Sequence, residues 1–282
     1  MKKLLVLVLF VGIAAFVTAN AFAADISDIM PALNNAKQAI DATLLGIDKD
    51  ISAAAKGLSA TDLKGDAARK ILNGLRENRP YVIDCSIIDA NGLKITVEPA
   101  EYKQYEGVNR SDLSSVILLL KTKKPGMSDV YHSAEGIHAI SIGYPIFSDK
   151  GEFLGAARML IRHEVFLKPL VEDKPCKIWV MQKNGLIVYD ADPEEIGQNI
   201  FTDSIFKPFA DLVSFSKTVA LTKDGAGSYN FYADRPNDKT LVQKMAAWDT
   251  AGIYGTEWRV VAMEIEKAPE KPAAAKQEMP AK

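Results

Sequence analysis

The most regular hydrophobic pattern of the chain runs from residue 26 to residue 58. Apolar residues recur there at steps of three or four, which is the spacing of one face of an α-helix. They are Ile29, Leu33, Ala36, Ile40, Leu44, Ile47, Ile51 and Leu58, with Ala54 or Ala55 between the last two. Pro31 falls in the first turns, where a helix tolerates proline. The pattern predicts one long amphipathic helix, whose apolar face either crosses a sheet or pairs with a second copy of itself.

A second, shorter helix is predicted after the long one. Ser59 with Asp62 three positions later has the form of a capping box, which marks a helix start. Apolar residues at helical spacing continue between 67 and 75. The helix is expected to end before the Arg79-Pro80 pair, because the residue before a proline disfavours helical geometry.

Beyond residue 80 the apolar pattern changes to that of β-strands. YVIDCSIID at 81–89 predicts a strand, Asn91-Gly92 a hairpin turn, and 93–97 the returning strand. A helical stretch at 112–121 follows. Three further strands are predicted at 128–133, 137–146 and 153–161.

The same order of elements then occurs a second time. A strand at 176–182 is followed by an Asn184-Gly185 turn, and Pro193 and Gly197 stand where Pro99 and Gly107 stand in the first set. The remaining predicted elements are the return strand 186–190, a helix at 206–215, and strands at 219–221, 228–233, 241–247 and 258–265. The repeated turn residues indicate one supersecondary unit used twice. The predicted fold class is therefore α+β, with two tandem antiparallel sheets and covering helices on a long N-terminal helix.

The two ends of the chain have patterns of their own. Lys2 and Lys3, an apolar run from 4 to 17 and the small residues Ala21-Phe22-Ala23 form a secretory signal pattern. Cleavage is expected after Ala23, and the alternative is an uncleaved N-terminal anchor. Either outcome places the rest of the chain in the periplasm or outside the cell. Residues 267–282 are rich in Ala, Pro and Lys and are expected to be disordered.

Composition narrows the classes of function. The formal net charge of −2 gives no sign of a surface for nucleic acid. Cys85 and Cys176 could pair in an oxidising compartment. Each lies near the start of a different predicted sheet, so two buried free thiols are the expected state.

The chain carries no motif for catalysis or for a cofactor. His132, His138 and His163 have no standard metal-ligand spacing. The sequence has neither a Gly-rich phosphate loop leading into a helix nor a G-x-S-x-G nucleophile motif. No enzyme activity, metal or cofactor is therefore expected.

Four segments together resemble a known family of sensor domains. They are ILNGLRENRPYVIDCSIIDANG at 71–92, GVNRSDLSSV at 107–116, PGMSDVYHSAEGIHAISIGYPIFSDKGEFLGAARMLI at 125–161 and NGLIVYDADPEEIGQNI at 184–200. With the long helix before them, they resemble the extracellular double Cache region, a PAS-like fold, over residues 26–266. The resemblance implies a protein that binds small extracellular metabolites, usually in the membrane-distal module, and passes the event to an output domain.

The resemblance also implies a division of the chain into segments. The expected segments are a signal peptide at 1–23, the two helices at 24–80, a membrane-distal-type Cache module at 81–165, a second, proximal-type module at 170–266, and the tail at 267–282. No apolar span follows Ile265. The signal is therefore expected to pass to a separate protein, such as a membrane receptor of chemotaxis or a sensor kinase.

A Cache pocket lies between one face of the sheet and the segment that covers it. Arg110, Tyr131, Tyr144 and Arg158 are the ligand-binding residues expected there, because arginine holds carboxylates bidentately and tyrosine offers a ring and a hydroxyl. Tyr131 stands where the amino-acid-binding members of the family also carry a tyrosine. The alternatives are a surface charge for Arg110, a core aromatic for Tyr131 and a place on the solvent face for Arg158.

The sequence departs from the amino-acid-binding subgroup at two places. That subgroup has an Arg-x-Trp-Tyr cluster at the covering helix and an aspartate near the end of the last strand. Here the residues are Arg110-Ser111-Asp112-Leu113 and 157–161 without an acid. The expected ligand is thus a small anionic or polar metabolite rather than an α-amino acid. The aromatic residues Tyr189, Tyr232, Trp248 and Trp258 of the second module are expected in its core, with a second pocket as the alternative.

The sequence thus predicts a secreted small-molecule sensor of the double Cache type, with a possible homodimer through the N-terminal helix. The alternative is an interaction or scaffold module that has lost its pocket and docks on a membrane receptor or envelope protein.

Overall fold

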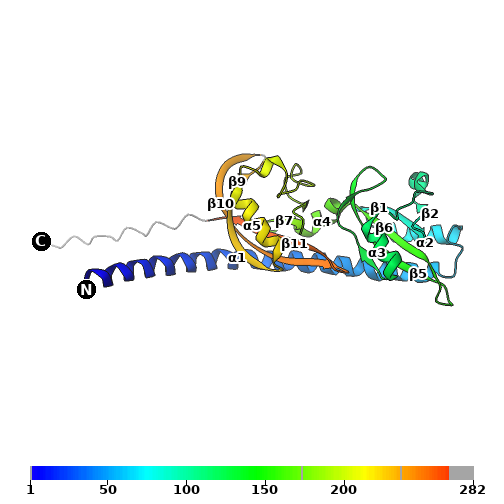
Figure 1. Cartoon of the computed structure of the whole chain (residues 1–282), viewed down its shortest axis with the longest axis horizontal. Helices are drawn as coiled ribbons and strands as arrows, with labels where there is room; N and C mark the ends of the chain where they lie inside the picture. The colour runs from blue at the N-terminus through cyan, green and yellow to red at the C-terminus, as the bar shows by residue number, and fades with distance from the viewer. Residues whose placement is uncertain (1, 173, 236, 267–282) are drawn as a thin grey trace.

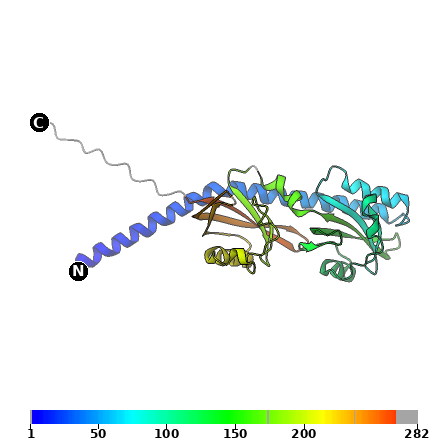
Figure 2. The ribbon, with the colours of Figure 1, turned by 90° about the horizontal axis from the view of Figure 1, so that it is seen from above.

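The computed structural model describes residues 2–172, 174–235 and 237–266, with side chains from residue 26 onward. Helix α1 (Lys2–Leu58) runs along the molecule, and two antiparallel sheets lie one after the other on its C-terminal part (Figures 1 and 2). The fold class predicted from the pattern is confirmed. The expected signal peptide and the expected tail lie outside the residues whose side chains are described.

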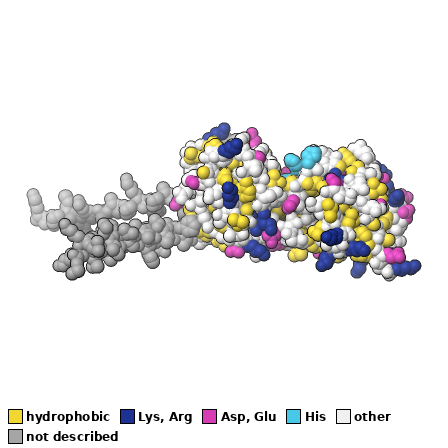
Figure 3. Space-filling model, in the orientation of Figure 1, with side chains coloured by type: hydrophobic (Ala, Val, Ile, Leu, Met, Phe, Trp, Pro, Cys, Tyr) yellow, Lys and Arg dark blue, Asp and Glu magenta, His cyan; other side chains and the backbone are white. Residues whose placement is uncertain are grey.

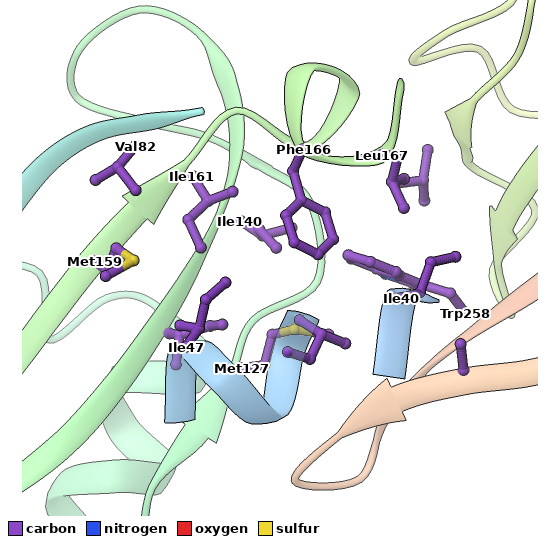
Figure 4. Packing of buried hydrophobic residues seen from close by; sticks show 14 of the residues in the cluster. Ile40, Ile47, Val82, Met127, Ile140, Met159, Ile161, Phe166, Leu167 and Trp258 are labelled. Atoms are coloured by element: carbon purple, nitrogen blue, oxygen red, sulfur yellow. The ribbon is translucent and has the colours of Figure 1, made fainter. Parts of the chain in front are cut away.

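The apolar face of α1 packs on both sheets and is the centre of the main core. Ile40, Ile47 and Leu58 are at most 1% exposed. Figure 4 shows Ile47 near Met159 and Ile161 of the first sheet, and Ile40 beside Trp258 of the second. Burial of such a side chain contributes about 1.5–3 kcal/mol, so α1 ties the two sheets together. Of the two uses predicted for its apolar face, the structure shows the sheet-crossing one.

The capping box predicted at Ser59 is wrong. Helix α2 (Asp66–Arg76) begins after Gly65, which makes no side-chain capping bond. The hydroxyls of Ser59 and Thr61 instead donate to the carbonyls of Lys56 and Leu58. These residues therefore end α1 rather than begin α2, since a short polar side chain can serve either helix terminus.

The first sheet has the strand order β2-β1-β6-β5-β3, with β4 also paired to β5. Its strands are β1 (Val82–Asp89), β2 (Lys94–Glu98), β3 (Gly126–Met127), β4 (Tyr131–His132), β5 (His138–Phe147) and β6 (Phe153–Ile161). The face away from α1 is covered by η1 (Ala100–Tyr105), α3 (Ser114–Thr122) and the loops beside them. The predicted strand 128–133 is shortened to β4, with β3 before it.

The second sheet repeats this order as β8-β7-β11-β10-β9. Its strands are β7 (Lys177–Gln182), β8 (Ile187–Tyr189), β9 (Gly225–Asp234), β10 (Asp238–Ile253) and β11 (Thr256–Ile265), and η2 (Ser204–Phe206) and α5 (Ala210–Leu221) cover it. The strand predicted at 219–221 is wrong, because α5 continues through it. Val219 is fully buried together with Ser216, one helical step earlier, which is why an apolar triplet there belongs to a helix.

Helix α4 (His163–Val171), which the sequence analysis did not predict, joins the two sheets. Its Phe166 packs edge-on against Trp258, with ring centroids 6.2 Å apart. Cys85 and Cys176 are free and buried. Among the residues with described side chains, no helix combines the length and the apolar character that a membrane crossing requires.

The two hairpins share their backbone geometry closely. Gly92 and Gly185 have φ angles of 82° and 89°, a region that glycine occupies readily. The side chains of Asn109 and Asn199 donate to the carbonyls of Asn91 and Asn184, at 3.3 and 2.9 Å. The same turn is therefore fastened by the same contact in each sheet, which explains why the Asn-Gly pair recurs.

Candidate functional site

A cavity of about 130 Å³ lies on the face of the second sheet that points away from α1. The sheet, the loop after β8, η2 and α5 form its walls. Its apolar lining consists of Trp179, Ile187, Ile200, Phe206, Leu212, Tyr229, Phe231 and Met263, and its charged lining of Lys177, Asp190, Asp192, Glu195, Asp234, Arg235 and Lys244.

Strand alternation places the sheet residues of the cavity. Successive side chains of a strand point to opposite faces, so Tyr229 and Phe231 on β9 share one face. Lys244 on β10 pairs with Tyr229 in the strand register and faces the same way. Its ammonium lies 5.4 Å from the centroid of the Phe231 ring. The floor of the cavity therefore combines aromatic rings with one lysine.

Two of the cations at the cavity are already paired. Arg235 lies 3.3 Å from Asp192, 2.9 Å from Glu194 and 3.7 Å from Glu195. Lys177 pairs with Asp234. The contacts of Arg235 hold the loop after β8 beside the end of β9, and the Lys177 contact joins β7 to the end of β9.

Asp190 and Lys244, by contrast, have no ionic partner within 4.0 Å among the residues that the structure describes. The carboxylate of Asp190 accepts one hydrogen bond, from the backbone N–H of Asp192 at 2.8 Å. Lys244 is only 4% exposed. Asp190 is half-buried, and it and Lys244 attract each other across the cavity without touching. Buried charges are costly unless they are paired, so an oppositely charged atom in the cavity would stabilise Lys244 in particular.

The pKa values of the cavity residues follow from burial. Burial raises the pKa of Asp190 to about 6. Burial, and then the nearby charge of Asp190, raises the pKa of Glu195 to about 8. Burial also lowers the pKa of Lys244. Burial in the cavity therefore favours the neutral forms of Asp190, Glu195 and Lys244.

In the first module, the predicted residues do not form one site. Arg110 and Tyr131 do come together, with the guanidinium 5.9 Å from the ring centroid. Arg158 is buried and donates to Ser141 Oγ at 2.5 Å. Tyr144 pairs with Ala157 across the β5–β6 ladder, which puts it on the opposite face of the sheet, toward α1. The four residues therefore occupy both faces.

Side chains fill most of the space near Arg158. The hollow beside it measures about 10 Å³ and is lined in part by Leu119 of α3. A Cβ at Gly143 would meet Leu119 Cδ1 at 2.7 Å. Nearby on the same sheet face, Lys94 pairs with Asp84 at 3.3 Å and with Glu135 at 2.7 Å, all three being buried. The charges of Lys94, Asp84 and Glu135 are therefore paired with one another inside the first module.

The aromatic residues singled out in the second module do not line the cavity. Trp258 is fully buried against α1 and α4, and Trp248 donates from Nε1 to Thr222 Oγ1 at 3.1 Å. The aromatic lining comes instead from Trp179, Tyr229 and Phe231. The available signal was Lys244, a charged residue in a predicted strand whose following residues are apolar.

The histidines gather near the junction of the two modules (Figure 3). His132 and His138 are cross-strand neighbours with rings 5.5 Å apart, and a Cβ on Gly197 of the second module would lie 3.6 Å from His138. His163 is buried and its Nδ1 lies 2.7 Å from the carbonyl oxygen of Val188. Within the described part of the chain, no group of three or more His, Cys, Asp or Glu side chains is arranged to hold a metal ion.

Comparison with known proteins places this architecture. Residues 42–163 match the model of the HK/GC/chemotaxis protein-like sensor domain. An extracellular ligand binding receptor from Desulfohalobium retbaense is 28% identical with a TM-score of 0.69, and the match covers 82% of this chain and 39% of that one. The fold is that of a Cache-type sensor domain.

Other Cache-type structures extend the likeness over both sheets at low identity. The ligand-binding domain of the Campylobacter jejuni chemoreceptor Tlp3, in complex with 4-methylisoleucine, has a TM-score of 0.65 at 13% identity, with 90% of this chain and 96% of that chain covered. The ligand-binding domain of the Pseudomonas aeruginosa PAO1 amino acid chemoreceptor PctC, in complex with GABA, has a TM-score of 0.61 at 14% identity, covering 83% and 96%. No curated protein matches the sequence.

These comparisons confirm the resemblance to Cache-type sensors that the motifs indicated. The matched family is one of sensing domains rather than catalytic ones. The match spans 39% of the length of the Desulfohalobium receptor. The likeness therefore concerns the sensor domain and does not extend to the activity of the longer receptor.

Proposed function

We propose that this chain is the ligand-binding part of a periplasmic or extracellular signalling system, and that its ligand enters the cavity of the second module. The observation that carries the proposal is the cavity of about 130 Å³ with a half-buried Asp190 and a buried Lys244 in its wall, neither of which forms an ion pair within 4.0 Å among the described residues. Such a combination of apolar walls and few polar groups is typical of small-molecule sites.

The contacts between the second module and α1 support a route for the signal. Strand β10 carries Lys244 in the cavity wall, and further along it Gly252 donates from its N–H to Asp41 of α1 at 3.1 Å. Tyr254, in the turn that follows, donates to Asp48 of α1. A ligand that draws the covering loop onto the sheet would shift β10 and, through these bonds, α1. The receiver would be a membrane receptor or a sensor kinase, either separate or within a longer chain.

The proposal keeps the module boundaries and the ligand-binding residues of the first module that the sequence predicted. The modules are taken as 81–165 and 170–266. Arg110 with Tyr131 offers a second, smaller place for a carboxylate, because a guanidinium beside an aromatic ring binds anions bidentately. A homodimer through α1 is compatible with this arrangement.

A thermal-shift screen of the mature protein with carboxylates, amines and amino acids tests the proposal. A ligand at one hundred times its Kd stabilises the folded chain by about 2.7 kcal/mol. The shift is expected to disappear in Asp190→Asn and to survive in Arg110→Ala. Loss in Arg110→Ala with retention in Asp190→Asn would move the site to the first module.

One observation favours the second candidate, an interaction module. The buried side chains of Lys94, Asp84 and Glu135 pair with one another on the face of the first sheet that points away from α1, as expected of a module that has lost its ligand. If no small molecule raises the melting temperature and a membrane partner does, the chain is an interaction module rather than a small-molecule sensor.

A further inference from the structure

Helices α3 and α5 occupy equivalent places in the two modules and lie on one side of the molecule, opposite α1 (Figure 2). Each packs on the face of its sheet that points away from α1. Whatever their outer faces share is therefore presented twice in the same direction. We infer that this side of the molecule docks on an anionic lipid bilayer, a role that goes beyond the proposed function and does not involve the cavity.

The outer face of α3 is apolar and leads into a group of lysines. Ile117 and Leu118 are 50% and 57% exposed, while Val116 and Leu119 hold the helix on its sheet. The exposed lysines that follow are Lys121, Lys123 and Lys124. Among the residues that the structure describes, none of these lysines forms an ion pair within 4.0 Å. The first module therefore presents exposed aliphatic side chains next to uncompensated positive charge.

The outer face of α5 repeats this combination. Leu221 is 87% exposed, and Lys217, four positions before it, lies on the same face of the helix. Ile117 and Lys121 have the same spacing on α3. Lys217 and the nearby Lys207 also lack an ionic partner within 4.0 Å in the described part of the chain. Both modules thus carry an aliphatic residue and a lysine on the side opposite α1.

An open groove of about 390 Å³ lies beside α5. Phe201 and Val213 are among its apolar lining residues, and Lys207 and Lys217 supply its positive charge. Asp203 also lines it, but its carboxylate accepts a hydrogen bond at 2.8 Å from the backbone N–H four residues earlier. Two lysines beside an apolar recess suit the phosphate of a lipid headgroup, because their methylene groups can stay on the apolar surface while the ammonium groups reach the phosphate.

The distribution of charge indicates an anionic surface. The chain as a whole has a formal charge of −2, so an attraction to anions has to come from a local basic surface. Figure 3 shows Lys and Arg side chains beside hydrophobic ones on the side that carries α3 and α5. The acids at the starts of these helices are engaged, since Asp112 lies 3.5 Å from Arg110 and Asp211 accepts from Asn230 at 2.6 Å. Each lysine close to an anionic bilayer strengthens binding about fivefold.

The shape of this side favours a bilayer over an acidic protein. The aliphatic side chains of Ile117, Leu118 and Leu221 protrude, so a protein partner would have to supply a hole for each of them. The interfacial layer of a bilayer accepts protruding apolar side chains at any position in its plane. Two helices that face the same way from an elongated molecule therefore match a flat, deformable surface.

Vesicle sedimentation with the full mature protein tests the inference. The probes are vesicles of phosphatidylcholine alone, vesicles with an equal amount of phosphatidylglycerol, and polyglutamate as an acidic polypeptide. The protein is expected to bind the phosphatidylglycerol vesicles at least tenfold more tightly than the neutral ones. Raising the salt from about 0.1 M to about 1 M shortens the screening length from about 10 Å to about 3 Å, so it is expected to weaken that binding.

Two double variants locate the contact. Ile117→Ser with Lys121→Gln alters α3, and Leu221→Ser with Lys217→Gln alters α5. All four positions are exposed, so both variants are expected to keep the melting temperature of the parent. Each is expected to weaken binding to the phosphatidylglycerol vesicles at least tenfold.

Leu45→Ser with Lys49→Gln is the matched control on α1. The two residues have the same four-residue spacing, Leu45 is 60% exposed, and α1 lies on the other side of the molecule (Figure 2). Lys49 stands between Asp48 and Asp50, so its charge is compensated locally. The control is expected to bind the vesicles as the parent protein does.

Several outcomes would overturn the inference. They are equal binding to neutral and anionic vesicles, binding that neither double variant weakens, and an equal loss of binding in the α1 control. Binding to polyglutamate without binding to vesicles would assign this side to an acidic protein instead. Absence of binding to every probe would also overturn the inference, and it would leave the proposed function intact because the ligand screen does not depend on these residues.

Discussion

Thr256 donates a hydrogen bond from Oγ1 to the backbone carbonyl of Met127 at 2.6 Å, and so joins the tip of the β10–β11 hairpin to the first sheet. Gln182 of the second sheet adds a second link by accepting from the N–H of Val130, also at 2.6 Å. The two modules are therefore connected by direct polar contacts as well as by α1.

Thr256→Val is expected to loosen this junction. The variant keeps the shape of the side chain and removes the hydroxyl, which leaves the Met127 carbonyl without that donor. The expected loss is about 1 kcal/mol in the free energy of unfolding, measured by urea denaturation. Thr240→Val, at an exposed position of β10, is the control. Equal urea midpoints for the two variants would contradict the importance of this bond.

Gly185→Ala is expected to destabilise the second module by more than Gly151→Ala destabilises the first. Both glycines have φ near 80–90°, so both variants carry the strain of a positive φ, about 1 kcal/mol. Only at Gly185 would the new Cβ also meet a ring carbon of Phe201, at 2.5 Å, whereas nothing lies within 4 Å at Gly151. Melting temperatures of the two variants check the difference, and equal values would refute it.

Glu195 is expected to make stability fall as pH rises. The folded chain raises the pKa of this carboxyl from 4.5 to about 8, so between these values the folded state binds more protons than the unfolded state. By linkage, the free energy of unfolding then decreases with pH, by up to about 1.4 kcal/mol per pH unit. The contribution is complete below about pH 4 and is lost above pH 8.

Glu195→Gln removes that titration. The free energy of unfolding of the variant, relative to that of the parent protein, is therefore expected to increase steadily between pH 5 and pH 8. The neighbouring Glu194→Gln, whose side chain is 70% exposed, is the control and is expected to follow the parent. A pH-independent difference between Glu195→Gln and the parent in denaturation curves would show that Glu195 does not titrate in this range.

Leu119→Ala is expected to reopen the hollow of the first module. Leu119 is 4% exposed and lies beside Arg158 and Gly143, so its truncation is expected to cost about 2–5 kcal/mol. Leu118→Ala, at a position 57% exposed, is expected to cost roughly 0.5 kcal/mol or less. Chemical denaturation compares them. A small effect at both positions would mean that Leu119 does not fill the first module.

Sequencing of the exported protein tests the N-terminal signal. A mature chain beginning at Ala24 is expected, because Ala21-Phe22-Ala23 has the form of a cleavage site. A chain that starts at Met1 in the membrane fraction would support the uncleaved anchor instead.

Local patterns predicted most of the fold. The 3.6-residue period between Ile29 and Leu58 and the repeated Asn-Gly turns gave the long helix and the two sheets, because both signals depend on neighbours within a few residues. Helix α4 was missed because it is short and contains Pro169. The apolar triplet 219–221 was predicted as a strand because three residues are too few to distinguish the 3.6-residue period of a helix from the two-residue period of a strand.

The candidate site was harder to predict because it depends on strand register and on contacts between distant segments. Tyr144 and Arg158 were expected together, but the β5–β6 register sets them on opposite faces, and a shift of one residue reverses a face. Asp190 and Lys244 are more than fifty residues apart, and only the folded sheet brings both to one cavity. The repeat itself gave no indication of which copy would keep an open interior.

Strand β10 is sixteen residues long, and its two ends serve different purposes. Lys244 and Gly252 are eight positions apart, which in extended backbone corresponds to about 26 Å. From Lys244 to Trp248 the strand pairs with both β9 and β11, and from there to Ile253 with β11 alone, so one strand connects the cavity to the contacts with α1. If the proposed function holds, an insertion in this strand between those residues is expected to uncouple ligand binding from α1 without altering either set of contacts.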